Sequence, residues 1–171
     1  MPIEKMIFQI FSAVITTFGF GLMFNIKNKN LIHTSIAGGL SWAIYLLGQK
    51  LEFPEGLSYF IATFTMAIYS EIVARKISTP VTTILIAALI PLAPGGGIYY
   101  TMYNLLDKNY PIAVQKGIQT FIIAGAMAVG IFSASTLFKL YAEIKTKLVK
   151  NSWVDCSTSC FLLYLQISFL Q

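Results

Sequence analysis

The chain has 171 residues, of which 56% are hydrophobic and only 11% are charged, and its formal net charge is +5. Soluble domains carry about 25% charged residues, so this composition excludes a water-soluble globule. The basic residues stand in short groups between apolar runs rather than in one patch, which argues against a nucleic-acid partner and predicts a membrane protein.

Five apolar segments follow one another, and each is long enough to cross a hydrocarbon core of about 30 Å as a helix. We therefore predict an all-α membrane protein, a polytopic bundle of about five transmembrane helices within residues 1–150. The segments cover residues 3–24, 31–47, 57–74, 81–106 and 112–140. Residues 151–171 read as a separate C-terminal tail, with disorder, an interfacial position and a non-native origin as three alternatives.

Small residues recur every four positions on the second and fifth segments, and such stripes let transmembrane helices pack closely. They predict extensive helix–helix contact, part of it with another chain. The two stripes are Ser35, Gly39 and Ala43, and Ala126, Gly130 and Ala134.

Near the end of the third segment, Glu71 and Arg75 are four residues apart and so share one helix face. An ionisable residue within a membrane span is a functional candidate, so the pair is a candidate for coupling transport to a proton gradient. The alternative is a simple ion pair at the membrane interface.

The fourth segment is interrupted in its middle by Pro91, Pro94 and three consecutive glycines, Gly95, Gly96 and Gly97. A broken helix survives in lipid only where protein or a wet cavity satisfies the freed backbone groups, and in transporters this place is commonly the substrate site. A kink packed against neighbouring helices, without a ligand, is the alternative.

The chemistry of this break follows from its residue types. Pro91 and Pro94 lack an N–H and are expected to free the carbonyls of Ala87 and Ile90. The glycines can adopt φ values that are closed to other residues, and they expose bare amides. If residues 98–106 form a second half-helix, its N-terminus faces the break and attracts anions. Free carbonyls and free amides together suit a zwitterion or a carboxylate.

No nucleotide-binding loop, nucleophile elbow or metal-ligand spacing stands in the sequence, so we expect no enzyme activity, cofactor or metal, and transport driven by a gradient. Cys156 and Cys160 are read as free structural thiols, and His33, the one histidine, as an interfacial residue at a helix start.

Charge asymmetry predicts the orientation in the cell (inner) membrane. If all five segments span, eight basic residues share one side and four lie on the other, which puts the C-terminus in the cytoplasm and the N-terminus outside. If the fourth segment is a re-entrant hairpin, the split becomes six against six. The bias favours a broken helix that spans. In the arrangement in which all five segments span, the side with four basic residues holds Lys5, Lys50, Lys108 and Lys116.

Three stretches have a recognisable pattern: Gly19–Asn25; Glu71 with Ala74, Arg75 and Pro80; and, most specific, Ile90–Gly96 followed by Tyr99. On these residues the chain resembles the threonine/serine exporter family, namely its small subunit, which corresponds to the C-terminal half of the long single-chain exporters. The resemblance covers about residues 1–150. It implies export of small amino acids, or of dicarboxylates such as succinate, and a larger membrane subunit as partner.

Together, the break and the resemblance predict a membrane subunit of a gradient-driven secondary exporter of threonine, serine or related carboxylates. A scaffold subunit that stabilises its larger partner without touching substrate is an alternative, and a homo-oligomeric channel ranks last. The predicted substrate-binding residues are Pro91, Pro94, Gly95, Gly96, Gly97 and Tyr99.

Overall fold

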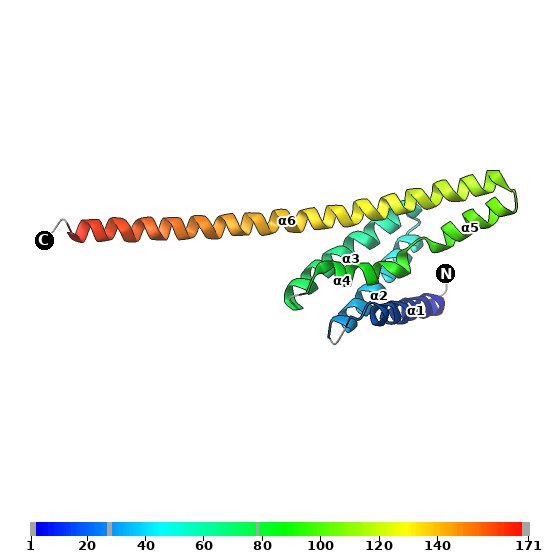
Figure 1. Cartoon of the computed structure of the whole chain (residues 1–171), viewed down its shortest axis with the longest axis horizontal. Coiled ribbons are helices and arrows are strands. Elements are labelled where there is room, and N and C mark those ends of the chain that lie inside the picture. The colour runs from blue at the N-terminus through cyan, green and yellow to red at the C-terminus, as the bar shows by residue number, and fades with distance from the viewer. Residues whose placement is uncertain (1–2, 27–28, 78, 169–171) are drawn as a thin grey trace. The chain divides into compact units, whose positions relative to one another are not determined.

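The computed structural model describes residues 3–26, 29–77 and 79–168, with side-chain detail for residues 3–26, 30–77 and 79–144. Within these ranges every regular element is a helix, as predicted (Figure 1). The elements are α1 (Ile3–Met23), α2 (Lys29–Lys50), α3 (Glu55–Ile77), α4 (Val81–Leu89), the short 3₁₀ helix η1 (Ile90–Leu92), α5 (Gly95–Leu106) and α6 (Tyr110–Ser168).

Four stretches are long and apolar enough to cross a membrane: Ile3–Met23, Asn30–Lys50, Glu55–Ile77 and Tyr110–Ile144. Val81–Leu92 and Gly95–Leu106 pass the same test together but are bent by 50° at the predicted break. The all-α bundle of four to five spans and the interruption of the fourth segment are therefore confirmed. Whether the bent pair crosses the membrane or re-enters it stays a prediction.

Three of the connections between helices share one type of helix C-terminus. Asn25, Glu52 and Lys108 have positive φ values of 56°, 58° and 59°, in the left-handed region. After α1, the N–H of Asn25 donates to the carbonyl of Leu22 at 3.0 Å and that of Ile26 to the carbonyl of Gly21 at 2.9 Å. This pair of hydrogen bonds is a Schellman motif, which satisfies the last carbonyls of the helix. It recurs after α2 and α5 and ends those helices sharply.

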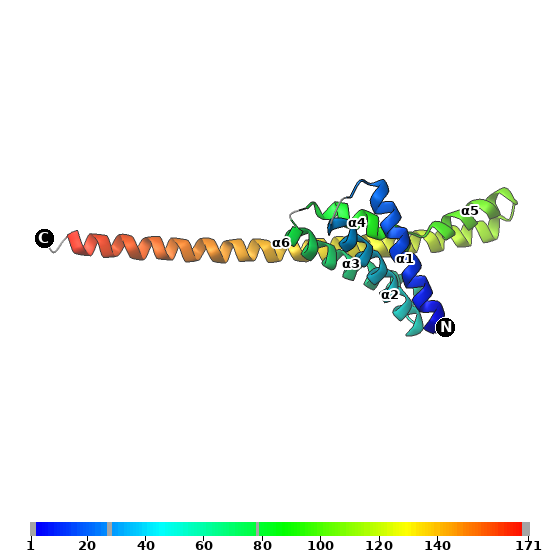
Figure 2. The same ribbon diagram turned by 90° about the horizontal axis from the view of Figure 1, so that it is seen from below.

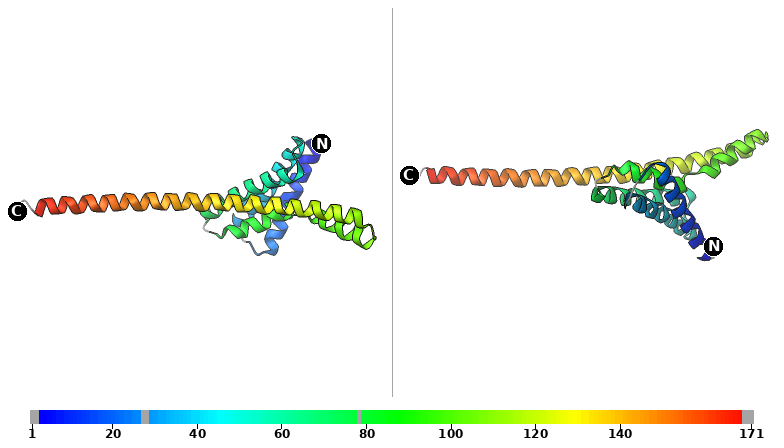
Figure 3. Two further views of the ribbon diagram at one scale, coloured as in Figure 1. Left: turned by 90° about the horizontal axis from the view of Figure 1, so that it is seen from above. Right: turned by 60° about the horizontal axis from the view of Figure 1, so that its bottom comes forward.

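The chain divides into two compact units, residues 1–135 and residues 136–171, and α6 passes through position 150 without ending there. In the first unit α2 is central, since it contacts α1, α3 and α4 (Figure 2). The hairpin formed by α5 and the first part of α6 has its helices side by side (Figure 3). In the second unit the backbone is helical to Ser168.

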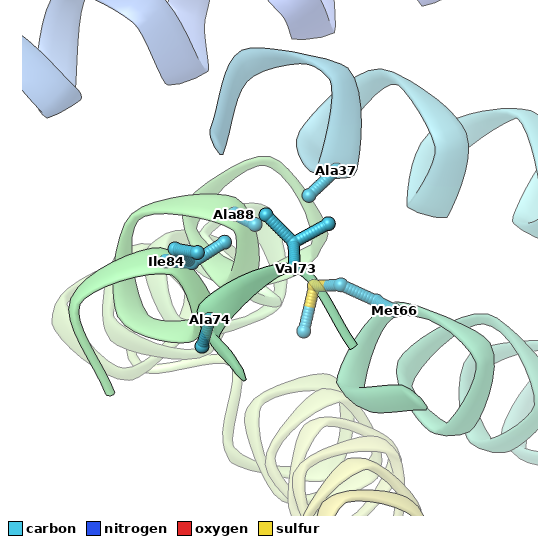
Figure 4. Close-up of a cluster of buried hydrophobic side chains, with 6 residues drawn as sticks. All are labelled: Ala37, Met66, Val73, Ala74, Ile84 and Ala88. Carbon is cyan, nitrogen blue, oxygen red and sulfur yellow. The ribbon is translucent and has the colours of Figure 1, made fainter. Parts of the chain in front are cut away.

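Small side chains make these helix contacts close. A Cβ added to Gly130 of α6 would lie 2.9 Å from the carbonyl oxygen of Phe60 in α3, and one added to Gly39 of α2 would overlap Val14 of α1. Two of the predicted small-residue positions thus lie where helices meet. The main core cluster lies where α2, α3 and α4 meet (Figure 4). It contains Ala37, Met66, Val73, Ala74, Ile84 and Ala88.

Several buried hydroxyl groups inside this bundle donate hydrogen bonds to their own helix. The hydroxyls of Thr17, Thr34 and Thr63 are buried, and each donates to a carbonyl four residues back at 2.7–2.8 Å. Such back-bonding satisfies hydroxyls where no water is at hand. On the outer surface, large apolar side chains of α1 such as Phe8, Phe11 and Ile15 are exposed, as expected of a helix that faces lipid or a partner.

Candidate functional site at the helix break

The backbone at the break is tightly turned. In η1, the N–H of Ala93 donates to the carbonyls of Leu89 at 3.0 Å and Ile90 at 3.1 Å. The expectation that Pro94 leaves the Ile90 carbonyl free is therefore wrong, because the 3₁₀ turn supplies another donor. Pro94 itself has φ −76° and ψ 52°, and Gly95 N–H donates across it to the carbonyl of Ala93 at 2.7 Å. This is an inverse γ-turn.

Helix α5 then begins at Gly95, with Pro94 as its N-cap residue. The expectation that the glycines use φ values closed to other residues is also wrong, since none of the described glycines has a positive φ. Gly95 and Gly96 border open space, whereas a Cβ on Gly97 would overlap Thr120 of α6. Of the three glycines, only Gly97 is therefore required by close packing between helices.

The break lines a cavity of about 360 Å³, which we call the break pocket. Its walls come from the break itself, from α5 and α6, from the start of α3, and from Trp42 of α2. The lining residues are Trp42, Glu55, Tyr59, Pro91, Ala93, Pro94, Gly96, Gly97, Tyr100, Lys116, Gln119, Thr120 and Ile123.

Four of the six residues predicted to bind substrate line this pocket, namely Pro91, Pro94, Gly96 and Gly97. A glycine can line a pocket only with backbone, and the first N–H groups of a helix have no acceptor within it. The backbone amides of Gly96 and Gly97 are therefore candidate hydrogen-bond donors for this wall of the pocket. Gly95 and Tyr99 do not line the pocket: the Gly95 amide is bonded to Ala93, and Tyr99 is 64% exposed.

The pocket also carries charges of both signs that our sequence-based prediction missed. Glu55 stands at the start of α3, and Lys116 stands on α6 together with Gln119 and Thr120. Gln119 Nε2 donates a hydrogen bond to Glu55 Oε2, so the carboxylate is held by a residue of α6. One signal could have found Lys116, since a charge within an apolar span is a functional candidate by default.

Aromatic rings form the wall toward α2 and α3. The rings of Trp42 and Tyr45 have centroids 5.2 Å apart, and those of Tyr45 and Tyr59 are 4.5 Å apart. Tyr59 is buried and packs with Leu92 of η1 and Ile123 of α6. This packing joins the break to both helices and gives one side of the pocket a rigid, apolar surface.

Glu71 and Arg75 do not line the break pocket. They lie toward the other end of α3 from Glu55, roughly 24 Å along the helix axis at 1.5 Å per residue. Glu71 is buried, and its Oε2 accepts from Arg75 Nη2 at 3.3 Å, while the Arg75 side chain is 49% exposed. The ion pair is thus present, and a role in proton coupling stays a prediction.

The remaining candidate residues are also apart from this site. His33 is the fifth residue of α2, where its Nδ1 is buried and has no hydrogen-bond partner among the described residues. Among the residues with described side chains, no group of three or more His, Cys, Asp and Glu could hold a metal ion. Cys156 and Cys160 lie outside those residues.

Comparison with known proteins shows which family this chain belongs to. The family described as "Threonine/Serine exporter, ThrE" matches residues 9–137, a stretch that holds the break and every residue of the pocket. An uncharacterized protein of Haemophilus influenzae is 24% identical over 142 residues, which cover 78% of this chain and 48% of that protein. The chain thus spans about half the length of this curated relative. No solved structure matches the chain. With a family match over most of its length, this all-helical membrane protein belongs to the threonine/serine exporter family.

Proposed function

We propose that this chain is one subunit of a gradient-driven secondary exporter of small amino acids such as threonine and serine, and that the substrate binds in the break pocket. The observation that carries the proposal is the meeting of a carboxylate, an ammonium group and bare helix N-terminal amides at the break. These are the groups that a zwitterion needs.

The charges suggest how the substrate is oriented. Its carboxylate would lie toward Lys116 and the amides of Gly96 and Gly97, because the N-terminus of a helix favours an anion. Its ammonium group would lie toward Glu55. The volume of about 360 Å³ is at the small end of ligand pockets, which suits a small substrate.

Export of a dicarboxylate such as succinate is the second candidate. It shares the requirement for Lys116 and the α5 amides, but its second carboxylate would approach Glu55. Like charges at short distance are repulsive, and such a contact selects against the wrong ligand. The presence of Glu55 therefore favours an amino acid.

A partner subunit is part of the proposal. The chain covers 48% of its Haemophilus relative, which is consistent with a transporter completed by a second, larger membrane subunit of the same family. The scaffold alternative assigns the pocket no role, and it is therefore open to test. We place the complex in the inner membrane with the N-terminus of this chain outside and its C-terminus in the cytoplasm, on the charge bias described above.

The test is amino-acid efflux from cells that express this chain together with its larger partner. Lys116→Gln removes the pocket ammonium group, and Lys108→Gln, in the α5–α6 turn, is the matched control. We expect efflux of threonine and serine to fall at least tenfold for Lys116→Gln and to stay unchanged for the control. Equal efflux from both variants, at equal expression, would support the scaffold alternative instead.

A further inference from the structure

The cavity next to the break pocket has polar features that the proposed function does not use. It lies between α1 and the break, has a volume of about 370 Å³, and we call it the α1 groove. Trp42 and Pro91 line both the α1 groove and the break pocket, so the two cavities adjoin at these two residues. The other residues used below are Gln9, Ser12 and Thr16, which α1 contributes to the groove.

Gln9, Ser12 and Thr16 are three and four residues apart, so they share one face of α1. This face is polar on a helix whose neighbouring side chains, such as Phe8 and Phe11, are exposed and apolar. Polar side chains that face hydrocarbon are unfavourable, and so such a face is expected to meet a polar ligand, water or protein.

Two buried polar atoms of the groove have no hydrogen-bond partner among the described residues. One is Gln9 Oε1, an acceptor, and the other is Trp42 Nε1, whose N–H is a donor. Both side chains line the α1 groove, and both also line a second cavity that continues toward the end of α2. A buried polar atom without a partner is unfavourable, and a ligand that pairs with both atoms would remove that cost.

We propose that Gln9 and Trp42 form a hydroxyl-recognition site beside the break pocket. An aliphatic hydroxyl is small and neutral, and it both accepts and donates, so Trp42 N–H can donate to its oxygen while its proton is donated to Gln9 Oε1. The hydroxyl site rests on the proposed function. In that function Glu55, Lys116 and the α5 amides bind the zwitterionic part of the substrate. Gln9 and Trp42 would then bind the hydroxyl group of its side chain. Both polar atoms are covered here, so the indole must turn to admit the hydroxyl.

The first test measures ligand binding at the hydroxyl site in the absence of transport. The chain has two tryptophans, and Trp153→Phe leaves Trp42 as the single tryptophan in the full chain held in lipid nanodiscs, where it is excited selectively over the nine tyrosines. Serine and alanine differ by one hydroxyl. We expect serine to change the Trp42 emission at a concentration about tenfold lower than alanine, which corresponds to one hydrogen bond of about 1.4 kcal/mol. Gln9→Leu should bring the two titrations together.

Gln115→Leu, on α6 and outside the α1 groove, is the matched control and should leave the serine preference intact. Equal responses to serine and alanine, as a water molecule at this site would produce, or a preference that survives Gln9→Leu, would overturn the proposal.

The second test is the ratio of serine efflux to alanine efflux from cells. We expect Trp42→Phe, which keeps the ring and removes the N–H, to lower this ratio three- to tenfold while alanine efflux persists. Efflux with an unchanged ratio overturns the hydroxyl site alone. A serine preference at Trp42 without any efflux supports the site and contradicts the proposed function, so the two failures are distinguishable.

Discussion

Gln119 donates a hydrogen bond to Glu55 from 64 residues further along the chain, and this contact joins α6 to the first turn of α3 at the rim of the break pocket. It positions the carboxylate that distinguishes an amino acid from a dicarboxylate in our proposal. The contact therefore links the fold of the bundle to the selectivity of the site.

Glu55→Gln keeps a hydrogen-bonding side chain but removes its charge. We expect serine efflux to fall at least tenfold, because the ammonium group of the substrate loses its counter-ion, whereas succinate efflux should be unchanged or higher. Efflux of both compounds from cells with equal amounts of the complex measures this shift. If the two fall in parallel, Glu55 does not select between them.

Gly97→Ala tests the close approach of α5 and α6. The added Cβ would overlap Thr120 Oγ1 and lie 3.2 Å from Thr120 Cβ. Overpacking of this kind costs about 1–3 kcal/mol, so we expect a lower melting temperature in detergent and reduced efflux. Gly95→Ala, where a Cβ meets open space, is the matched control and should be neutral. Thr120→Ala should restore the stability of Gly97→Ala, and the absence of this rescue would place the strain elsewhere.

Glu71→Gln tests the proton-coupling role. The substitution preserves shape and removes the titrating group, so we expect efflux to persist at a lower rate and to lose its response to an imposed pH gradient. The response is measured in proteoliposomes of the complex, with Arg75→Gln as the control that removes the opposite charge of the pair. A full response in Glu71→Gln would leave the pair with a purely structural role.

Lys108→Gly tests the turn between α5 and α6. Lys108 has a φ of 59°, and its N–H donates to the carbonyl of Leu105 at 3.2 Å. A left-handed conformation costs a residue with a Cβ about 1–2 kcal/mol, and glycine avoids this cost. We expect the melting temperature to rise, whereas Lys108→Ala should leave it near that of the unmodified chain. A rise with alanine as well would point to the loss of charge rather than to φ.

Hydropathy predicted the apolar spans, and the prolines and glycines predicted the position of the break, since spans and breakers are local properties of the chain. The continuation of α6 to Ser168 was not predicted. The hydrogen bonding of individual carbonyls and the φ values of the glycines could not be predicted in the same way. The Ile90 carbonyl is occupied because η1 tightens into a 3₁₀ turn, and the glycines stay in helical φ because α5 begins at once at Gly95. Both depend on the neighbours that pack around the break.

The charged residues of the pocket were missed for a different reason. Glu55 and Lys116 are each close to the end of a span, and sequence alone gives no distance between the start of α3 and α6. Tyr99 was included with its motif, but on a helix one step of residue number rotates the side chain by about 100°, so Tyr100 lines the pocket instead.

The 3₁₀ turn and the γ-turn have a consequence for the transport cycle that we propose. The interruption keeps the carbonyls of Leu89, Ile90 and Ala93 partnered by its own amides, so these three groups need no bound substrate as a hydrogen-bond partner. A carrier that releases its load on one side must return vacant to the other. In the export cycle that we propose, an interruption whose carbonyls stay paired without substrate would permit that return step without a large rise in free energy.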